Sequence, residues 1–178
     1  MVSSPVDRYG CREMINPKVE AALNDQIRKE FYSSYLYLSM AAKFESMNLK
    51  GFAHWMEVQA GEETKHAMKI YGHVNERGGK VTLQAMDAPP CNWKSARDMF
   101  ADAYRHEQKV TESINHIVEV ARAKKDNATE VFLQWFVNEQ VEEEASTNEI
   151  AQKLQLIGDN GPALIMLDGD LRKRVSAT

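Results

Sequence analysis

The sequence has few of the residues that break helices or cross-link a chain. Among its 178 residues are only five prolines, nine glycines and two cysteines. Proline and glycine disfavour the interior of a helix, so their scarcity permits long helices. The two cysteines, Cys11 and Cys91, form no Cys-x-x-Cys pair, which excludes a rubredoxin-type or zinc-ribbon module and gives no disulfide framework.

Two further absences narrow the class of protein. No run approaches the roughly 20 apolar residues that a membrane helix needs, and the first eight residues lack the apolar core of a signal peptide. We therefore expect a protein of the reducing cytoplasm, with no membrane partner. The formal net charge of −4 also argues against nucleic acid as a partner.

Helix boundary signals predict four long helices and a short fifth one. Asn16-Pro17 is an N-cap followed by proline at the first helical position, and Ser95 with Asp98 forms a capping arrangement. Gly78-Gly79 is a C-terminal signal. The expected helices run from Pro17 to about Met47, from the link 48–51 to Gly78, from Ser95 to about Lys125, from Asn127 to Gly158, and from Ala163 to about Arg174.

The lengths of the links predict how these helices are arranged. Short links at 48–51 and at Asp126-Asn127 make antiparallel neighbours, whereas the stretch Lys80–Lys94, with strand-like residues 81–83, is long enough to cross the bundle. The fold class is therefore all-α, a four-helix bundle with one long crossover between the second and third helices. The fifth helix is too short to be stable alone, so its apolar face should dock. We divide the chain into a tail (1–15), the bundle (16–158) and the fifth helix with the C-terminus (159–178).

Each long helix carries one glutamate in a heptad row that is otherwise almost entirely apolar. Residues seven apart point the same way. Burying an ionised carboxylate costs several kcal/mol, and a whole domain is stable by only roughly 5–15 kcal/mol, so four buried glutamates need compensating positive charge. The rows contain no lysine or arginine. They are Leu23, Glu30, Tyr37, Phe44; Met56, Glu63, Ile70; Phe100, Glu107, Ile114, Ala121; and Phe136, Glu143, Ile150, Ile157.

The residues near these glutamates indicate metal ions as the compensating charge. His66 lies three residues after Glu63, on the same helix face, where both can bind one ion. All four glutamates lie about halfway along their helices and should meet at one level. The fourth helix offers Gln140-x-x-Glu143, so the ligands are oxygen-rich with one imidazole, which suits iron or manganese better than zinc or copper. The alternative is four ordinary solvated glutamates.

More carboxylates lie beside this set. Glu62 adjoins Glu63, and Glu139 and Glu142 share one helix face with Glu143. Like charges so close destabilise a helix unless a cation lies among them. We therefore expect a third, looser metal position formed by Glu62, Glu139, Glu142 and a shared Glu143, with a solvated acidic face as the alternative.

Several other side chains near the site allow two interpretations. Tyr37 lies one heptad beyond Glu30 and could approach the metal ions or simply fill the core. Trp135 could donate an electron, although packing is the simpler interpretation. Three methionines fall in or near the apolar faces and are expected in the core. They are Met40, Met56 and Met68.

Four segments around these residues carry a family resemblance. They are Phe31–Tyr37 after Glu30, then Glu62–His66, Tyr104–Glu107 and Phe132–Glu144. Through them, residues 16–174 resemble the non-haem ferritins of bacteria and archaea. The resemblance implies a ferritin-like bundle that oxidises Fe(II) with dioxygen or hydrogen peroxide and stores Fe(III) as a hydrous oxide mineral. It also implies a hollow shell, with 24 copies in similar proteins and the fifth helix near the four-fold axes.

The resemblance also implies a role for each site residue. Glu30, Glu63 and His66 match ferroxidase site A, while a bridging Glu63 with Glu107 and Glu143 matches site B, beside Gln140. Glu62, Glu139, Glu142 and Glu143 match the third iron site of the family, and Tyr37 matches its ferroxidase tyrosine. Asp126 and Glu130 are candidates for iron entry near three-fold axes.

Departures from related families limit the alternatives. Bacterioferritins bind haem through a methionine where this chain has Thr64, and they keep a histidine where it has Glu143. No haem is therefore expected. A di-iron oxygenase or peroxidase should keep a second histidine, and a metal-free structural bundle should carry apolar residues in place of the four glutamates.

Overall fold

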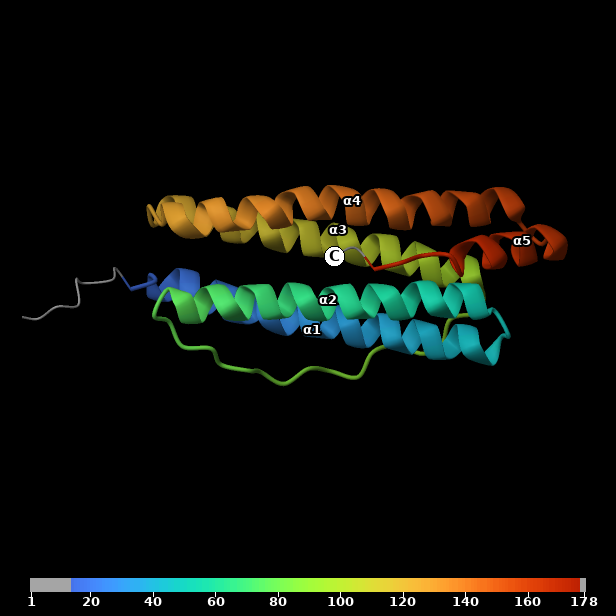
Figure 1. Cartoon of the computed structure of the whole chain (residues 1–178), viewed down its shortest axis with the longest axis horizontal. Helices are drawn as coiled ribbons and strands as arrows, with labels where there is room; N and C mark the ends of the chain where they lie inside the picture. The colour runs from blue at the N-terminus through green and yellow to red at the C-terminus, as the bar shows by residue number, and fades with distance from the viewer. Residues whose placement is uncertain (1–13, 177–178) are drawn as a thin grey trace, which may run out of the picture.

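Five helices form the protein, whose computed structural model describes residues 14–176. Four long helices lie side by side along one axis, and the short fifth helix packs at one end (Figure 1). The expected all-α bundle with a long crossover is confirmed. The helices are α1 (Pro17–Ser46), α2 (Lys50–Glu76), α3 (Ala96–Ala123), α4 (Asn127–Ile157) and α5 (Gly161–Leu171).

Side-chain caps begin three of the long helices, and those at Asn16 and Ser95 were expected. Side-chain oxygens of Asn16, Ser95 and Asp126 accept hydrogen bonds from backbone N–H groups in the first turns of α1, α3 and α4. The start of α2 is capped from elsewhere, because Leu49 precedes it. Asp168 of α5 accepts hydrogen bonds from the N–H groups of Gly51 (2.8 Å) and Phe52 (3.0 Å). A Cβ atom on Gly51 would lie 1.6 Å from the backbone oxygen of Asp168, so this contact requires glycine.

The crossover 80–94 runs outside the bundle along its full length (Figure 1). Its strand-like residues 81–83 form no strand and belong to the irregular segment. Side chains of the helices bind it at several points along its length. The N–H of Thr82 donates to Asn24, Ser39 donates to the Pro90 carbonyl (2.7 Å), and the Trp93 indole donates to a neighbouring carboxylate of α3.

Two apolar clusters fill the bundle, one on either side of its middle. One contains Phe44, Phe52 and Phe100, and the other contains Leu23 and Phe136. The heptad rows pass through both clusters, so the glutamates that interrupt these rows lie in the layer between them. None of the helices between residues 14 and 176 is long and apolar enough to cross a membrane.

Three details differ from the sequence expectations. α5 begins two residues before Ala163, because Asn160 caps it, and it ends at Leu171 rather than Arg174. Ile15, assigned to the tail, is only 4% exposed and donates its N–H to the Arg77 carbonyl. Met68 is 48% exposed, so its placement in the core was wrong, whereas Met40 and Met56 are fully buried. Cys11 lies outside the described residues, and Cys91 is exposed.

Candidate metal centre

Four glutamates from four helices are buried at mid-length in the bundle. Glu30 is 1% exposed, Glu63 2%, Glu107 0% and Glu143 5%, in agreement with their heptad rows. No lysine or arginine lies in these rows, and His66 is also buried. Bound cations would stabilise a layer of this composition, because each buried, ionised carboxylate needs a positively charged partner.

Glu30, Glu63 and His66 form the first group of potential ligands. One ligand atom from each lies within 4.8 Å of the others, and His66 Nδ1 lies 3.4 Å from Glu63 Oε2. Gln26 donates to Glu30 Oε1 (2.9 Å), but Glu30 Oε2 is buried with no hydrogen-bond partner among the described residues. A group that contains an imidazole nitrogen and a carboxylate with an unsatisfied buried oxygen fits a divalent cation.

A second group shares the same imidazole from its other side. His66, Glu139 and Glu143 also offer ligand atoms within 4.8 Å of one another, and His66 Nε2 lies 3.8 Å from Glu139 Oε1. From the sequence, Glu139 was expected only at the outer third position. In this structure Glu139 therefore lies closer to the predicted site A histidine than expected.

Glu107 is held by hydrogen bonds instead of belonging to either group. The Tyr37 hydroxyl donates to Glu107 Oε1, and Gln140 Nε2 donates to Glu107 Oε2 (3.2 Å). Both donors were expected near the metal ions. The structure thus brings Glu107, Tyr37 and Gln140 together beside the two ligand groups.

Two glutamines that the sequence analysis did not single out orient the carboxylates. Gln59 Nε2 donates to Glu63 Oε1 (3.1 Å) and to Glu143 Oε2 (2.7 Å), which joins α2 to α4. Gln26 and Gln59 each precede a buried glutamate by four residues, so they occupy the same helix face. This repeated Gln-x-x-x-Glu spacing is the signal that could have found them.

Burial raises the pKa of every carboxyl in the layer. Desolvation and the nearby Glu63 raise the pKa of Glu30 from 4.5 to about 8. Burial raises the pKa of Glu107 to about 7, and burial with the adjacent Glu107 raises that of Glu143 to about 7. The pKa of Glu63 also lies well above its usual value, because of burial and the Glu107 charge. The metal-free layer therefore keeps protons near neutral pH, which cations would displace.

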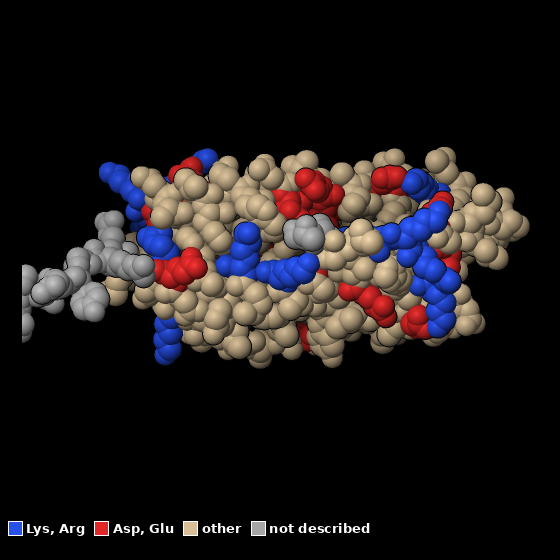
Figure 2. All heavy atoms as spheres, viewed as in Figure 1, with Lys and Arg blue, Asp and Glu red and all other residues tan. Residues whose placement is uncertain are grey.

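Among residues 14–176, no group of ligand atoms within 4.8 Å of one another contains three of the four residues expected at the third position. Glu62 is buried and pairs with Arg174, whose Nη2 lies 2.5 Å from Glu62 Oε2. Glu139 is half-buried and Glu142 is exposed. Figure 2 shows acidic side chains gathered at mid-length over α4, so this face is open to solvent.

The aromatic side chains fall into two roles. Tyr37 is fully buried, and burial together with the Glu107 charge raises its pKa well above 10. Trp135 is 38% exposed, but its ring centroid lies 5.4 Å from His66 and 4.8 Å from Phe136. The geometry therefore shows that Trp135 packs against His66.

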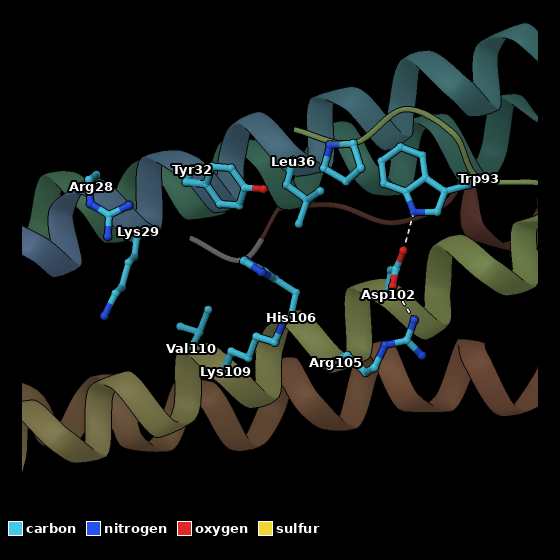
Figure 3. A pocket seen from close by; sticks show the side chains of 11 residues that line it. Arg28, Lys29, Tyr32, Leu36, Trp93, Asp102, Arg105, His106, Lys109 and Val110 are labelled. Carbon is cyan, nitrogen blue, oxygen red and sulfur yellow. Dashed lines mark hydrogen bonds and ion pairs between the residues drawn. The ribbon is translucent and has the colours of Figure 1, made fainter. Parts of the chain in front are cut away.

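His106, which belongs to the segment Tyr104–Glu107, lies between a pocket and the metal centre. A pocket of about 370 Å³ opens between α1 and α3, and Figure 3 shows His106, Tyr32 and Lys109 in its lining. The His106 ring contacts the Tyr37 ring (6.2 Å between centroids), and its Nε2 lies 2.7 Å from Ser33 Oγ. Burial lowers the pKa of His106 to about 4, so the side chain is neutral near pH 7.

A buried carboxylate and histidine cluster inside a four-helix bundle, in which one long crossover joins two antiparallel hairpins, defines the class of ferritin-like metal proteins. The comparisons with known proteins agree. The sequence model of the Ferritin family, described as a ferritin-like domain, matches residues 20–157. The chain belongs to the ferritin family and is a non-haem ferritin, a protein of iron storage.

Relatives of this chain come from bacteria and archaea. It is 40% identical to the bacterial non-heme ferritin of Bacteroides fragilis (strain 638R), over 90% of this chain and 100% of the relative. It is 42% identical to that of Campylobacter jejuni, over 87% and 93%. Among solved structures it is similar to an engineered closed form of Archaeoglobus fulgidus ferritin, with a TM-score of 0.90, 52% identity, and coverage of 92% and 99%. An open-pore ferritin from the same archaeon gives a TM-score of 0.90 and 52% identity over 90% and 98%.

Proposed function

We propose that the buried layer is a di-iron ferroxidase centre that binds and oxidises Fe(II). Glu30, Glu63 and His66 bind the first ion, and a bridging Glu63 with Glu107 and Glu143 binds the second, beside Gln140. The observation that carries this proposal is that Glu30, whose buried Oε2 has no hydrogen-bond partner among the described residues, forms with Glu63 and His66 a group whose ligand atoms lie within 4.8 Å of one another. Iron is the substrate here, and the carboxylates are its binding groups.

The chain contributes charge and position to the oxidation. Binding of two Fe(II) ions displaces the protons that burial keeps on the glutamates. The ionised carboxylates then favour the higher charge of Fe(III), so they assist the loss of one electron from each ion. The two electrons reduce dioxygen to hydrogen peroxide, or hydrogen peroxide to water, with protons taken up. Tyr37, which donates to Glu107, keeps that carboxylate oriented toward the second ion.

We also propose the finer features that the resemblance implies. A third iron position uses Glu62, Glu139, Glu142 and Glu143, and Glu62 must first leave Arg174. Haem is not expected, since Thr64 has no thioether to bind it. Iron entry past Asp126 and Glu130 requires ion pairs to open, because these acids bind Arg77 (2.7 Å) and Arg122 (2.6 Å). The working location is the cytoplasm.

Storage requires a closed shell, for which we propose 24 copies. Apolar side chains at the end of α4 and on α5 support an assembly, because Leu156 is 88% exposed, Ile165 70% and Met166 75%. Exposed apolar patches of this kind mark surfaces that other chains cover. Gel filtration should give a particle of about half a megadalton for a closed shell, and a monomer-sized peak would refute this part.

Anaerobic Fe(II) titration followed by air tests the proposed function. The wild type should bind about two Fe(II) per subunit tightly, oxidise them rapidly and then retain many more irons as mineral. Glu107→Leu should lose the rapid oxidation, whereas Glu112→Gln, an exposed glutamate of the same helix, should keep it. Equal oxidation rates in both variants, or retention of only the first two irons, would contradict ferroxidase-driven storage.

A further inference from the structure

The chain beyond α5 returns toward the middle of the bundle as a C-terminal strap, residues 172–176 (Figure 1). The strap lies along α2. The carbonyl of Arg174 lies 2.8 Å from His54 Nε2, and Lys65 Nζ donates to Ser176 Oγ (2.9 Å). Together with the Asp168 cap at the start of α2, these contacts fix the strap from the end of the bundle to its centre.

Arg174 carries the strap's contact with the metal centre. Its side chain is 19% exposed, and its guanidinium lies 4.0 Å from the centroid of the Trp55 ring. The same guanidinium donates to the Trp55 carbonyl (3.3 Å), to Gln59 Oε1 (2.6 Å) and to Glu62 Oε2 (2.5 Å). A stacked arginine with three hydrogen-bond acceptors is held in one orientation.

Through Gln59, Arg174 acts on two of the proposed iron ligands. The amide oxygen of Gln59 accepts from Arg174, so its nitrogen must face Glu63 and Glu143, to which it donates. Without the arginine, either end of the amide could face the carboxylates. Arg174 thereby determines which end of Gln59 orients these ligands.

At Glu62, Arg174 provides the positive charge that a buried carboxylate requires. Glu62 is 6% exposed and is one of the four residues of the proposed third iron position. The guanidinium already occupies Glu62 Oε2, so the ion pair and a metal ion compete for the same carboxylate.

We propose that Arg174 is a positioning residue of the metal centre and a tethered cation at its third position. It fixes Gln59 toward Glu63 and Glu143, and a metal ion that binds Glu62 must displace it together with the strap. The proposal rests on the proposed function, because it takes Glu63 and Glu143 as iron ligands. Since such coupling is reciprocal, loss of Arg174 strengthens binding of a third cation, and a third cation releases the strap.

Titration of the metal-free protein with Zn²⁺, which undergoes no oxidation, tests the tethered cation. Calorimetry should show two tight ions and a weaker third ion per subunit in the wild type. Arg174→Ala should strengthen the third binding step by about tenfold, within the usual range of coupling. The matched control is Lys173→Ala, which removes the same charge from an exposed neighbour that forms an ion pair with Asp170. This variant should change the third step less than about twofold.

Hydrogen–deuterium exchange of the wild type follows the strap directly. Exchange in residues 172–176 should stay unchanged through the second equivalent of Zn²⁺ and become faster with the third. Exchange that stays constant, or becomes slower, on addition of the third ion would overturn displacement of the strap.

The positioning role needs a different readout, the visible absorption spectrum of Co²⁺ bound at the two inner positions. Arg174→Lys keeps the charge but lacks the planar fork that reaches both Gln59 and Glu62. The Co²⁺ spectrum should therefore change in Arg174→Lys and in Arg174→Ala and remain unchanged in Lys173→Ala. The third Zn²⁺ should bind Arg174→Lys with nearly wild-type affinity.

The outcomes test the two roles of Arg174 and the proposed function separately. An unchanged third Zn²⁺ affinity in Arg174→Ala overturns the tethered cation, and identical Co²⁺ spectra overturn the positioning role. A wild type that binds no tight Zn²⁺ overturns the proposed function, and with it the inference. If Arg174→Ala fails to fold, Arg174→Lys still tests the positioning role, and hydrogen exchange of the wild type still tests the strap.

Discussion

Raising the pH should destabilise the metal-free protein, because its buried glutamates bind protons more tightly when folded. Glu143 has a pKa of about 7 in the fold against 4.5 as its ordinary value. A carboxyl whose folded pKa is raised contributes stability that is fully present below 4.5 and lost as the pH rises through 7. One such group corresponds to about 3 kcal/mol between about pH 4 and pH 8.

The carboxyls of the layer interact and titrate as a set. The value for one group is therefore a lower bound on the total loss of stability. For a chain of this size, about 3 kcal/mol lowers the melting temperature by roughly 6–12 °C. Calorimetric melting curves across this pH range should show that fall for the metal-free protein. With saturating Zn²⁺ the trend should reverse, because the ions bind the ionised carboxylates and replace their protons.

Glu107→Leu provides the matched test of this reasoning. It removes one raised carboxyl, so its melting temperature should depend less on pH, and the metal-free variant should be at least as stable as the wild type above pH 7. Glu112→Gln, on the exposed side of α3, should keep the wild-type slope. A metal-free wild type whose melting temperature stays level or rises toward pH 8 would refute the argument.

Three further predictions concern single side chains. Asp168→Ala removes the cap of α2, a loss of about 1 kcal/mol, and should lower the melting temperature by roughly 2–4 °C. The control Asp170→Ala should change the melting temperature little, and equal melting temperatures of the two variants would contradict the cap. Phe100→Ala removes a ring that packs against three other aromatic rings, and denaturant unfolding should show that the free energy of unfolding falls by roughly 3–5 kcal/mol. A fall of less than about 1 kcal/mol would argue against this packing. Tyr37→Phe should still bind two Zn²⁺ but oxidise Fe(II) more slowly in stopped-flow measurements, and an unchanged rate would leave Tyr37 with packing alone.

The long helices could be predicted because their signals are local. Asn16, Ser95 and Asp126 each lie within three residues of the N–H group that they cap, so the chain itself indicates where these helices begin. The heptad rows likewise show which residues share a face, and Glu30 and Glu107 are buried as their rows require. Met68 was misplaced because it lies two residues before the buried Ile70, on the opposite side of α2.

The remaining features depend on contacts between distant residues. Arg174 binds Glu62 across 112 positions, and nothing in the local pattern of 172–176 indicates a buried ion pair. Gln59 joins α2 to α4, so its role required the packing of two helices to be known. Beyond Leu171, where α5 ends, the side chains of Arg174 and Ser176 also find their partners on α2, far away in the sequence.

The cap of α2 makes the first hairpin depend on the order of synthesis. The N–H groups of Gly51 and Phe52 have their acceptor 117 and 116 residues later in the chain, so most of the protein is synthesised before Asp168 is added. At about 5–20 residues per second, this delay is roughly 6–23 s. During that interval the nascent α2 has two N–H groups bound to water at its first turn, and the arrival of the last helix completes an element that was made among the earliest.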